Sequence, residues 1–168
     1  MIVNKQYSYN KDHFIIFDFE TTGLTDNDEI IEYAFLEFKN NELVANITSL
    51  IKPSVLISDL ITNITGISNK DVMNKSTIDK HIDAIANFID GKDLVAHNVS
   101  FDLRFLNKIM INKNITINAI DSISVIKSKV KHNTYKLDFL REHYNINLVN
   151  HRAYDDCLIV KAVLDKVL

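Results

Sequence analysis

The sequence has one cysteine, one proline and three glycines in 168 residues. A single cysteine excludes a framework of internal disulfide bonds, and the place of Cys157 in an apolar helical pattern predicts a packed core thiol rather than a nucleophile. We find no linker, internal repeat or low-complexity segment, and a hydrophobic content of 46% is sufficient for a full core at this length. The sequence therefore predicts one domain, residues 1–168, with residues 1–13 as an N-terminal extension.

Long hydrophobic runs are absent as well. No apolar run approaches the roughly 18 residues that a membrane-spanning helix needs. The polar stretch from Met1 to Lys11 lacks the apolar core of a secretory signal. We therefore expect a cytoplasmic protein with no membrane partner.

Two carboxylates, Asp18 and Glu20, follow an apolar run at residues 14–17. Residues i and i+2 of a strand point to the same face, so the two acids lie close together and repel unless a proton or a cation lies between them. Carboxylate oxygens are hard ligands that suit Mg²⁺ or Mn²⁺. The pattern predicts a divalent metal site and phosphate chemistry. The Thr-Thr-Gly that follows could form a turn with Gly23 at a positive φ.

A second segment places an acid at the start of a helix. An apolar run at residues 94–96 predicts a buried strand, and residues 101–111 repeat their apolar side chains at helical spacing. Asp102 then lies in the first helical turn, where the helix dipole favours an acid whatever its function. His97 lies at the strand end. It could be a core histidine with its hydrogen bonds satisfied or a residue of the site, and the sequence favours neither reading.

A third segment begins at His151 and continues into an amphipathic helix. Asp155 and Asp156 both lie near the start of that helix. Adjacent helical residues point about 100 degrees apart, so only one of the two acids can face a shared site. His132 and His143 lie nearby, but no acid follows either at the spacing that separates His151 from Asp156.

In this order, the motifs D-x-E-T-T-G, H-N-x-x-F-D and H-x-A-x-x-D resemble the three motifs of the DEDDh exonucleases, the DnaQ-like group of the ribonuclease H-like superfamily. The resemblance extends from Phe14 to the C-terminus. It is closest to the proofreading exonucleases of bacterial DNA polymerase III, of the epsilon type or of the Gram-positive replicative polymerase. Oligoribonucleases and tRNA-trimming relatives carry the same catalytic set.

The resemblance implies a metal-dependent 3′–5′ exonuclease with two divalent ions, Mg²⁺ or Mn²⁺. Its expected substrate is a single-stranded or frayed DNA 3′ end, cleaved to nucleoside 5′-monophosphates, with an RNA 3′ end as the alternative. The family spacing selects Asp156 over Asp155. The implied metal ligands are Asp18, Glu20, Asp102 and Asp156, with His151 as the general base. The implied substrate contacts are Thr21, Thr22, Gly23, Ile64, Thr65, Ile67, His97 and Phe101.

Positive charge is scarce for a nucleic-acid enzyme, since 22 acidic residues outnumber 19 lysines and arginines. Phosphate contacts usually need a basic face. A nuclease that binds metal cations at an acidic site, however, needs to contact only a short segment at one strand end. The basic stretch from Lys127 to Lys136 is either a solvated loop or a rim that contacts the nucleic-acid backbone.

The chain ends in the helix of the third motif, without the tail that tethers an epsilon-type subunit to its polymerase. We therefore expect a free-standing enzyme with at most weak association with a DNA polymerase.

The order of the elements predicts an α/β, ribonuclease H-like fold. Its sheet should be mixed, mostly parallel and five-stranded, with one antiparallel strand and helices on both faces. The strands are expected near residues 14–17, 30–38, 43–51, 94–96 and 115–120. The helices are expected near 58–65, 78–89 and 101–111, and near Ser122, Lys136 and Ala153.

Two other classes of function share part of this pattern. A phosphatase of the haloacid dehalogenase type also has paired acids after an early strand, but it requires Asp-x-Asp-x-Thr, and Glu20 argues against it. A catalytically inactive nucleic-acid-binding module of the same fold would normally lose one of the acids. All four acids and the histidine are present here, which favours the nuclease.

Overall fold

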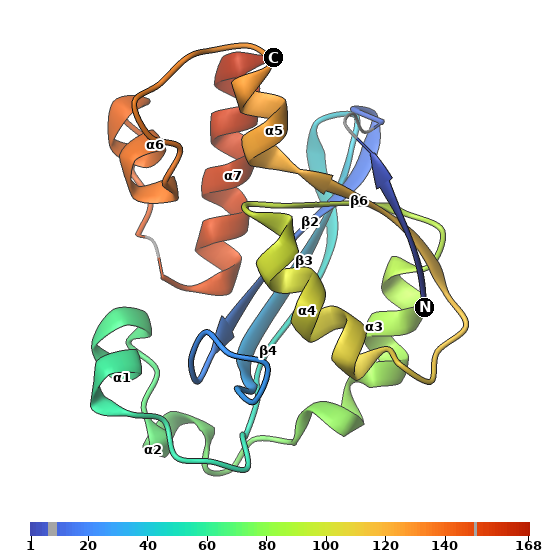
Figure 1. The fold of residues 1–168 in the computed structure, drawn as a ribbon, viewed down its shortest axis with the longest axis vertical. Helices are drawn as coiled ribbons and strands as arrows, with labels where there is room; N and C mark the ends of the chain where they lie inside the picture. Colours follow the sequence, from blue (N-terminus) through green and yellow to red (C-terminus); the bar gives the residue numbers. More distant parts are fainter. Residues whose placement is uncertain (7–9, 150) are drawn as a thin grey trace.

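The computed structural model describes residues 1–6, 10–149 and 151–168. Its centre is one six-stranded sheet with the order β1-β6-β5-β2-β3-β4 (Figure 1). β3 runs antiparallel to both of its neighbours, and the other neighbouring pairs are parallel. This confirms the mixed α/β, mostly parallel architecture. The strands are β1 (Ile2–Gln6), β2 (His13–Thr21), β3 (Ile30–Lys39), β4 (Glu42–Leu50), β5 (Asp93–Ala96) and β6 (Thr116–Asp121).

The expectation of five strands is wrong by one, because the start of the predicted N-terminal extension forms β1. β1 pairs in parallel with β6, with Ile2 opposite Thr116. The side chains of Asn4 and Asn118 share a hydrogen bond of 3.2 Å across the pair. An edge strand needs only one neighbour and tolerates polar residues, so β1 lacks the apolar run by which the other strands are found.

The helices lie where the apolar spacing predicts them, with two differences. The helix expected at residues 78–89 is divided at His81, whose Nδ1 lies 3.0 Å from the Tyr33 hydroxyl. A short helix, α2, follows α1 without having been predicted. None of the helices in the described part of the chain is both long enough and apolar enough to cross a membrane. The helical elements are α1 (Asp59–Thr65), α2 (Asn69–Val72), the 3-10 turn η1 (Ile78–Lys80), α3 (Ile82–Ile89), α4 (Val99–Ile109), α5 (Ser122–Lys127), α6 (Leu137–His143) and α7 (Ala153–Val167).

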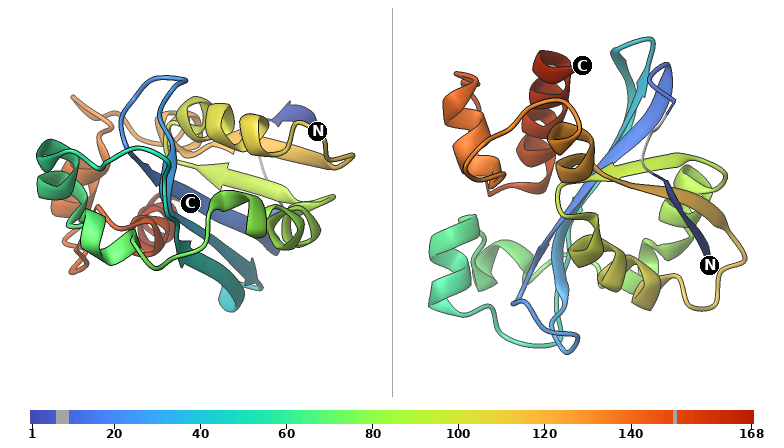
Figure 2. Two further views of the ribbon diagram at one scale, coloured as in Figure 1. Left: turned by 90° about the horizontal axis from the view of Figure 1, so that it is seen from below. Right: turned by 45° about the horizontal axis from the view of Figure 1, so that its top comes forward.

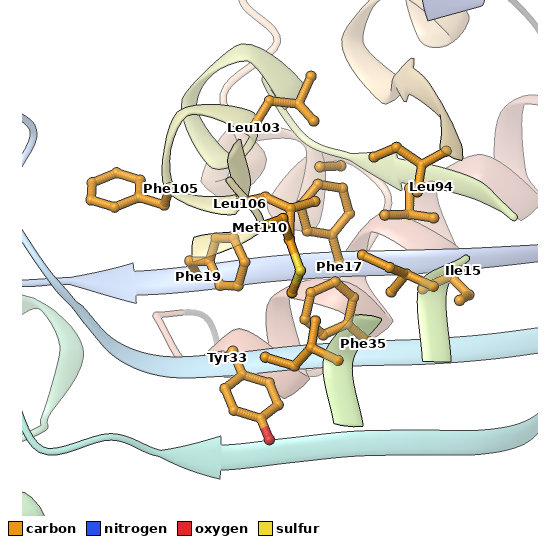
Figure 3. Packing of buried hydrophobic residues seen from close by; sticks show 14 of the residues in the cluster. Ile15, Phe17, Phe19, Tyr33, Phe35, Leu94, Leu103, Phe105, Leu106 and Met110 are labelled. Carbon is orange, nitrogen blue, oxygen red and sulfur yellow. The ribbon is translucent and has the colours of Figure 1, made fainter. Parts of the chain in front are cut away.

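Helices cover both faces of the sheet (Figure 2). On one face, α3 and α4 pack on an aromatic core in which the rings of Phe17 and Phe35 stack with centroids 5.4 Å apart (Figure 3). On the other face, α5, α6 and α7 pack on the opposite side chains of β2 and β3. Cys157 of α7 is buried in this second core, which confirms its assignment as a packed thiol. The residues that precede and follow Asp18 on its own face therefore point toward α7.

Candidate active site

Three carboxylates from distant parts of the chain meet where β2 ends and α7 begins. Asp18, Glu20 and Asp156 each place a carboxylate oxygen within 4.8 Å of the other two. β2 carries the first two on one face, and α7 lies across that face with Asp156 in its first turn. Asp155, one residue earlier on α7, is half-buried and does not belong to the group. The structure thus brings together the strand pair and the acid that the spacing selects.

Asp102 approaches the same group from α4. Its side chain is buried, and its Oδ1 accepts a hydrogen bond of 3.1 Å from the backbone N–H of Phe19, the residue between Asp18 and Glu20. The start of α4 is therefore fixed to the end of β2. Of the neighbouring charges, Asp102 has the largest effect on the pKa of Asp18, which it raises in addition to the effect of burial.

The four acids carry more negative charge than their surroundings balance. Burial, and after it the neighbouring carboxylates, raises the pKa of Asp18 well above its ordinary value and that of Glu20 to about 8. Burial also raises the pKa of Asp102 to about 8 and that of Asp156 to about 7. Near neutral pH the cluster therefore holds protons unless a cation replaces them.

A fifth acid, Glu32 of β3, lies beside this cluster and was missed by the sequence analysis. It stands opposite Glu20 in the β2–β3 register and is only 4% exposed. Its carboxylate contacts the guanidinium of Arg152 and the backbone N–H of Ala153. The available signal was an acid inside the apolar run of residues 30–38, a position that a buried strand gives to a charge only when a partner compensates it.

His151 stands at the turn before α7 with a φ of 67°, a left-handed conformation unusual for a residue with a β-carbon. Its backbone N–H donates to both carboxylate oxygens of Asp156, at 3.2 and 3.1 Å. The imidazole is about half exposed, and its Nε2 lies 3.9 Å from Oδ1 of Asp138 in α6. The histidine of the third motif is therefore next to the acids, with its side chain on the open side of the site.

His97 has protein partners at both ring nitrogens. Nε2 lies 2.7 Å from the carbonyl oxygen of Tyr135, and Nδ1 lies 2.9 Å from the Ser122 hydroxyl. A carbonyl only accepts, so Nε2 carries the proton and Nδ1 accepts from Ser122. Burial lowers the pKa of His97, which keeps it neutral. This geometry favours the alternative of a satisfied core histidine, and the predicted substrate contact stays a prediction.

An open groove of about 540 Å³ extends from the acids along α5 and α6. Lys127 and Lys136, from the basic stretch, line it together with His151 and Asp156. The ammonium of Lys127 lies over the ring of Tyr135, 5.0 Å from its centroid. Two cations of the basic stretch therefore border the groove, as a backbone-contacting rim would require.

The loop after Glu20 is held by its own side chains. Thr21 donates to the carbonyl oxygen of Gly23 at 2.6 Å, and Thr22 donates to Asp28 at 3.0 Å. The expected positive φ of Gly23 is wrong. Glycine is needed here for space instead, because a β-carbon would lie 2.6 to 2.7 Å from the Asp28 carboxylate.

The remaining predicted contacts differ in how exposed they are to solvent. Ile64, at the end of α1, is 47% exposed. Thr65 and Ile67 are buried, with Ile67 in the small core that joins the α1–α2 lobe to Ile31 of β3. The ring of Phe101 is half-buried, with the Arg104 guanidinium 5.2 Å from its centroid. Ile64 and Phe101 are accessible to a ligand, whereas Thr65 and Ile67 could offer it little besides backbone atoms.

Comparison with known proteins agrees with this geometry. The RNase_T family model, described as "Exonuclease", matches residues 15–164. The DNA polymerase III PolC-type of Caldanaerobacter subterraneus is 32% identical over 160 residues, which are 92% of this chain and 11% of that protein. The corresponding protein of Thermotoga petrophila is 35% identical over 162 residues, 93% of this chain and 12% of that protein. The chain thus spans about a tenth of these relatives.

Among solved structures, exonuclease X in complex with 5′ overhanging duplex DNA superposes with a TM-score of 0.75 at 26% identity, over 92% of this chain and 90% of that one. The family model covers all three motifs, and the PolC-type relatives and this structure each match more than nine tenths of the chain. The chain therefore belongs to the RNase_T exonuclease family, and it is a nuclease of the DEDDh, DnaQ-like group that its motifs predict.

Proposed function

We propose that this chain is a 3′–5′ exonuclease that removes nucleotides from single-stranded or frayed DNA 3′ ends as nucleoside 5′-monophosphates. The observation that carries the proposal is the convergence of Asp18, Glu20 and Asp156 within 4.8 Å, with His151 joined to Asp156. The choice of DNA is supported by the PolC-type relatives and by the duplex DNA in the exonuclease X complex.

We propose that the site holds two divalent cations, Mg²⁺ or Mn²⁺, and the oxygen donors of the acidic cluster support this proposal. All four acids offer oxygen, and Arg152, which lowers the pKa of Glu20, is itself paired with Glu32. Asp18, Glu20 and Asp156 would hold one site, and Asp102 would contribute to a second through water. When bound, the ions would activate the attacking water and stabilise the charge that develops on the phosphate and on the leaving 3′-oxygen.

The other roles belong to the chain itself. His151, with its imidazole on the open side, would accept the proton of the attacking water as general base. Lys127 and Lys136 would hold the phosphates of the strand in the groove. Thr21, Thr22 and Gly23 would present a backbone close to the terminal nucleotide, next to Ile64 and Phe101.

The experiment that tests this compares three substrates of one sequence: a single strand of DNA, a duplex with mismatched 3′ ends, and short RNA. Each is 5′-end-labelled and incubated with Mg²⁺ or Mn²⁺, and the Asp18→Ala variant is the control for contaminating nucleases. We expect stepwise shortening from the 3′ end and the highest kcat/KM on single-stranded or mismatched DNA. A kcat/KM for RNA well above that for DNA would establish the RNA exonuclease instead, and full activity in a chelator would refute the metal-dependent mechanism.

The partners and the setting of the chain form part of the same proposal. We propose that residues 1–168 fold as one domain, act in the cytoplasm, and associate with a DNA polymerase weakly if at all. The PolC-type relatives, in which the matching region is about a tenth of the protein, support a link with replication. Co-sedimentation with a purified replicative polymerase, at concentrations from micromolar upward, measures that association.

A further inference from the structure

Glu32 is a buried carboxylate placed next to carboxylates. It is 4% exposed, it faces Glu20 across the β2–β3 pair, and it shares the α7 side of the sheet with Asp18. An acid in this position adds a negative charge next to the four carboxylates of the site, which already repel one another. Such a charge persists in a fold only when strong partners compensate it, and an apolar residue would serve packing alone at lower cost.

The partners of Glu32 are Arg152 and Ala153, at the start of α7. Oε1 accepts from Nη2 of Arg152 at 2.6 Å and from Nε at 3.2 Å, and Oε2 accepts from Nε at 3.0 Å. Oε2 also accepts from the backbone N–H of Ala153 at 3.0 Å. Two donors on each oxygen leave the carboxylate without capacity for a metal. Glu32 is therefore tied to the helix and is not a further metal ligand.

These contacts fix the first turn of α7. Arg152 is the N-cap residue and its own side chain makes no capping hydrogen bond, while Ala153 is the first helical residue. The N–H groups of a first helical turn have no partner within the helix, and Glu32 supplies one from the sheet. The N–H of Asp156 in turn donates to the carbonyl oxygen of Arg152 at 2.9 Å. Arg152 thus contacts Glu32 through its side chain and Asp156 through its carbonyl oxygen.

We propose that Glu32 and Arg152 act as one positioning pair, which fixes the start of α7 on the sheet so that Asp156 and His151 meet Asp18 and Glu20 in the geometry that hydrolysis needs. This inference rests on the nuclease function proposed above. Because the two charges cancel, the pair orders the helix without changing the net charge of the site. Glu32 and Arg152 contribute to rate through Asp156 and His151, without touching the substrate.

Glu37, on the same strand, provides a matched control. It is also buried, at 6% exposure, and its carboxylate lies 3.0 Å from Lys92 and 2.6 Å from His13. Its partners lie at the far end of β2 and β3, away from the acids. Glu37→Gln therefore measures what the loss of a buried, paired carboxylate in β3 does to stability alone.

The test compares Glu32→Gln, Arg152→Gln, the double variant, Arg152→Lys and Glu37→Gln. For each we would measure kcat and KM on single-stranded DNA with Mn²⁺, the free energy of unfolding in urea, and amide hydrogen exchange. We expect Glu32→Gln and Arg152→Gln to lower kcat by about 10- to 100-fold, as is usual for groups that orient metal ligands, with KM within about threefold. The double variant should be no slower than the slower single variant, because the two residues act as a unit. Arg152→Lys, which keeps the charge but loses the paired contact, should fall between Arg152→Gln and the parent.

Amide hydrogen exchange measures how firmly the start of α7 is fixed, and it does so independently of catalytic activity. In Glu32→Gln the amides of His151 and Ala153 should exchange faster, whereas in Glu37→Gln they should not. The proposal is overturned if Glu32→Gln retains kcat within about twofold of the parent, or if Glu37→Gln lowers kcat as much. Unchanged exchange at both amides would overturn it as well. If Glu32→Gln does not fold, Arg152→Lys carries the same comparison. An inactive parent with the expected exchange pattern would refute the proposed function and leave the positioning role standing.

Discussion

The backbone N–H of His151 donates to both carboxylate oxygens of Asp156, at 3.2 and 3.1 Å. The left-handed φ of His151, 67°, aims this N–H at the first turn of α7. The donor belongs to the backbone, so replacement of the imidazole leaves it in place. The hydrogen bond also lowers the pKa of Asp156, against the larger effect of burial. The structure thus separates the backbone contact of His151 with Asp156 from the role that we propose for its side chain.

We expect His151→Asn to lower kcat by roughly 10²- to 10⁴-fold, the usual contribution of a general base. Asparagine tolerates the left-handed conformation, so the hydrogen bond to Asp156 should remain. Mn²⁺ affinity, measured by calorimetry, should then change by no more than about threefold. His13→Asn, at the far end of β2, is the control. Loss of Mn²⁺ binding in step with rate would make His151 a ligand rather than a base.

Asp18→Asn should abolish turnover and at the same time stabilise the metal-free protein. Asp18 is buried among acids that raise its pKa, so the metal-free fold bears either its charge or the free-energy cost of keeping it protonated, and asparagine removes both. We expect the Tm of the metal-free variant at pH 8 to rise by about 2 to 4 °C and its further increase with Mn²⁺ to shrink. Asp155→Asn on α7 is the control, with normal turnover. A metal-free Tm below that of the parent would show that charge repulsion among the acids does not limit the stability of the metal-free fold.

The stability of the metal-free protein should fall as pH rises from about 6 to about 8. The folded pKa values of Glu20 and Asp102 are raised to about 8 and that of Asp156 to about 7. In this range the unfolded chain has ionised carboxylates, while the folded chain still binds protons, so each added pH unit favours unfolding. Millimolar Mg²⁺ or Mn²⁺ should remove most of this decline, because a bound cation replaces the protons. Urea denaturation at several pH values, with and without metal, measures it, and a metal-free stability that rises over this range would contradict the raised values.

Gly23→Ala should destabilise the protein by about 1 to 3 kcal/mol, the range for overpacking. The new methyl group would lie 2.6 to 2.7 Å from the Asp28 carboxylate, which hydrogen bonds to Thr22 and Thr25 and cannot move without breaking them. In an Asp28→Ala background the same change should cost much less. Equal costs in the two backgrounds, measured by urea denaturation, would show that Asp28 is not the obstacle.

Local spacing in the sequence, together with the family motifs, was enough to predict which acids gather at the site. Asp18 and Glu20 share a face because the side chains of a strand alternate with a period of two. The separation of His151 from Asp156 likewise follows from one turn and the start of one helix. These relationships depend on neighbours within a few residues. The helices and strands follow from equally local patterns, and their order along the chain predicts the mostly parallel sheet.

Tertiary structure alone decided which distant residues meet. The pairing of β1 with β6 depends on backbone hydrogen bonds between Ile2–Gln6 and a strand more than a hundred residues away, and polar side chains give no local sign of it. Glu32 and Arg152 are 120 residues apart in the sequence. They come into contact only because α7 packs across β2 and β3. The proton on Nε2 of His97 is likewise set by Tyr135 and Ser122, which other elements bring to it. The physical reason is that strand and helix patterns depend on a residue's own neighbours, whereas burial, charge compensation and hydrogen-bond partners depend on surfaces that exist only once the sheet has formed.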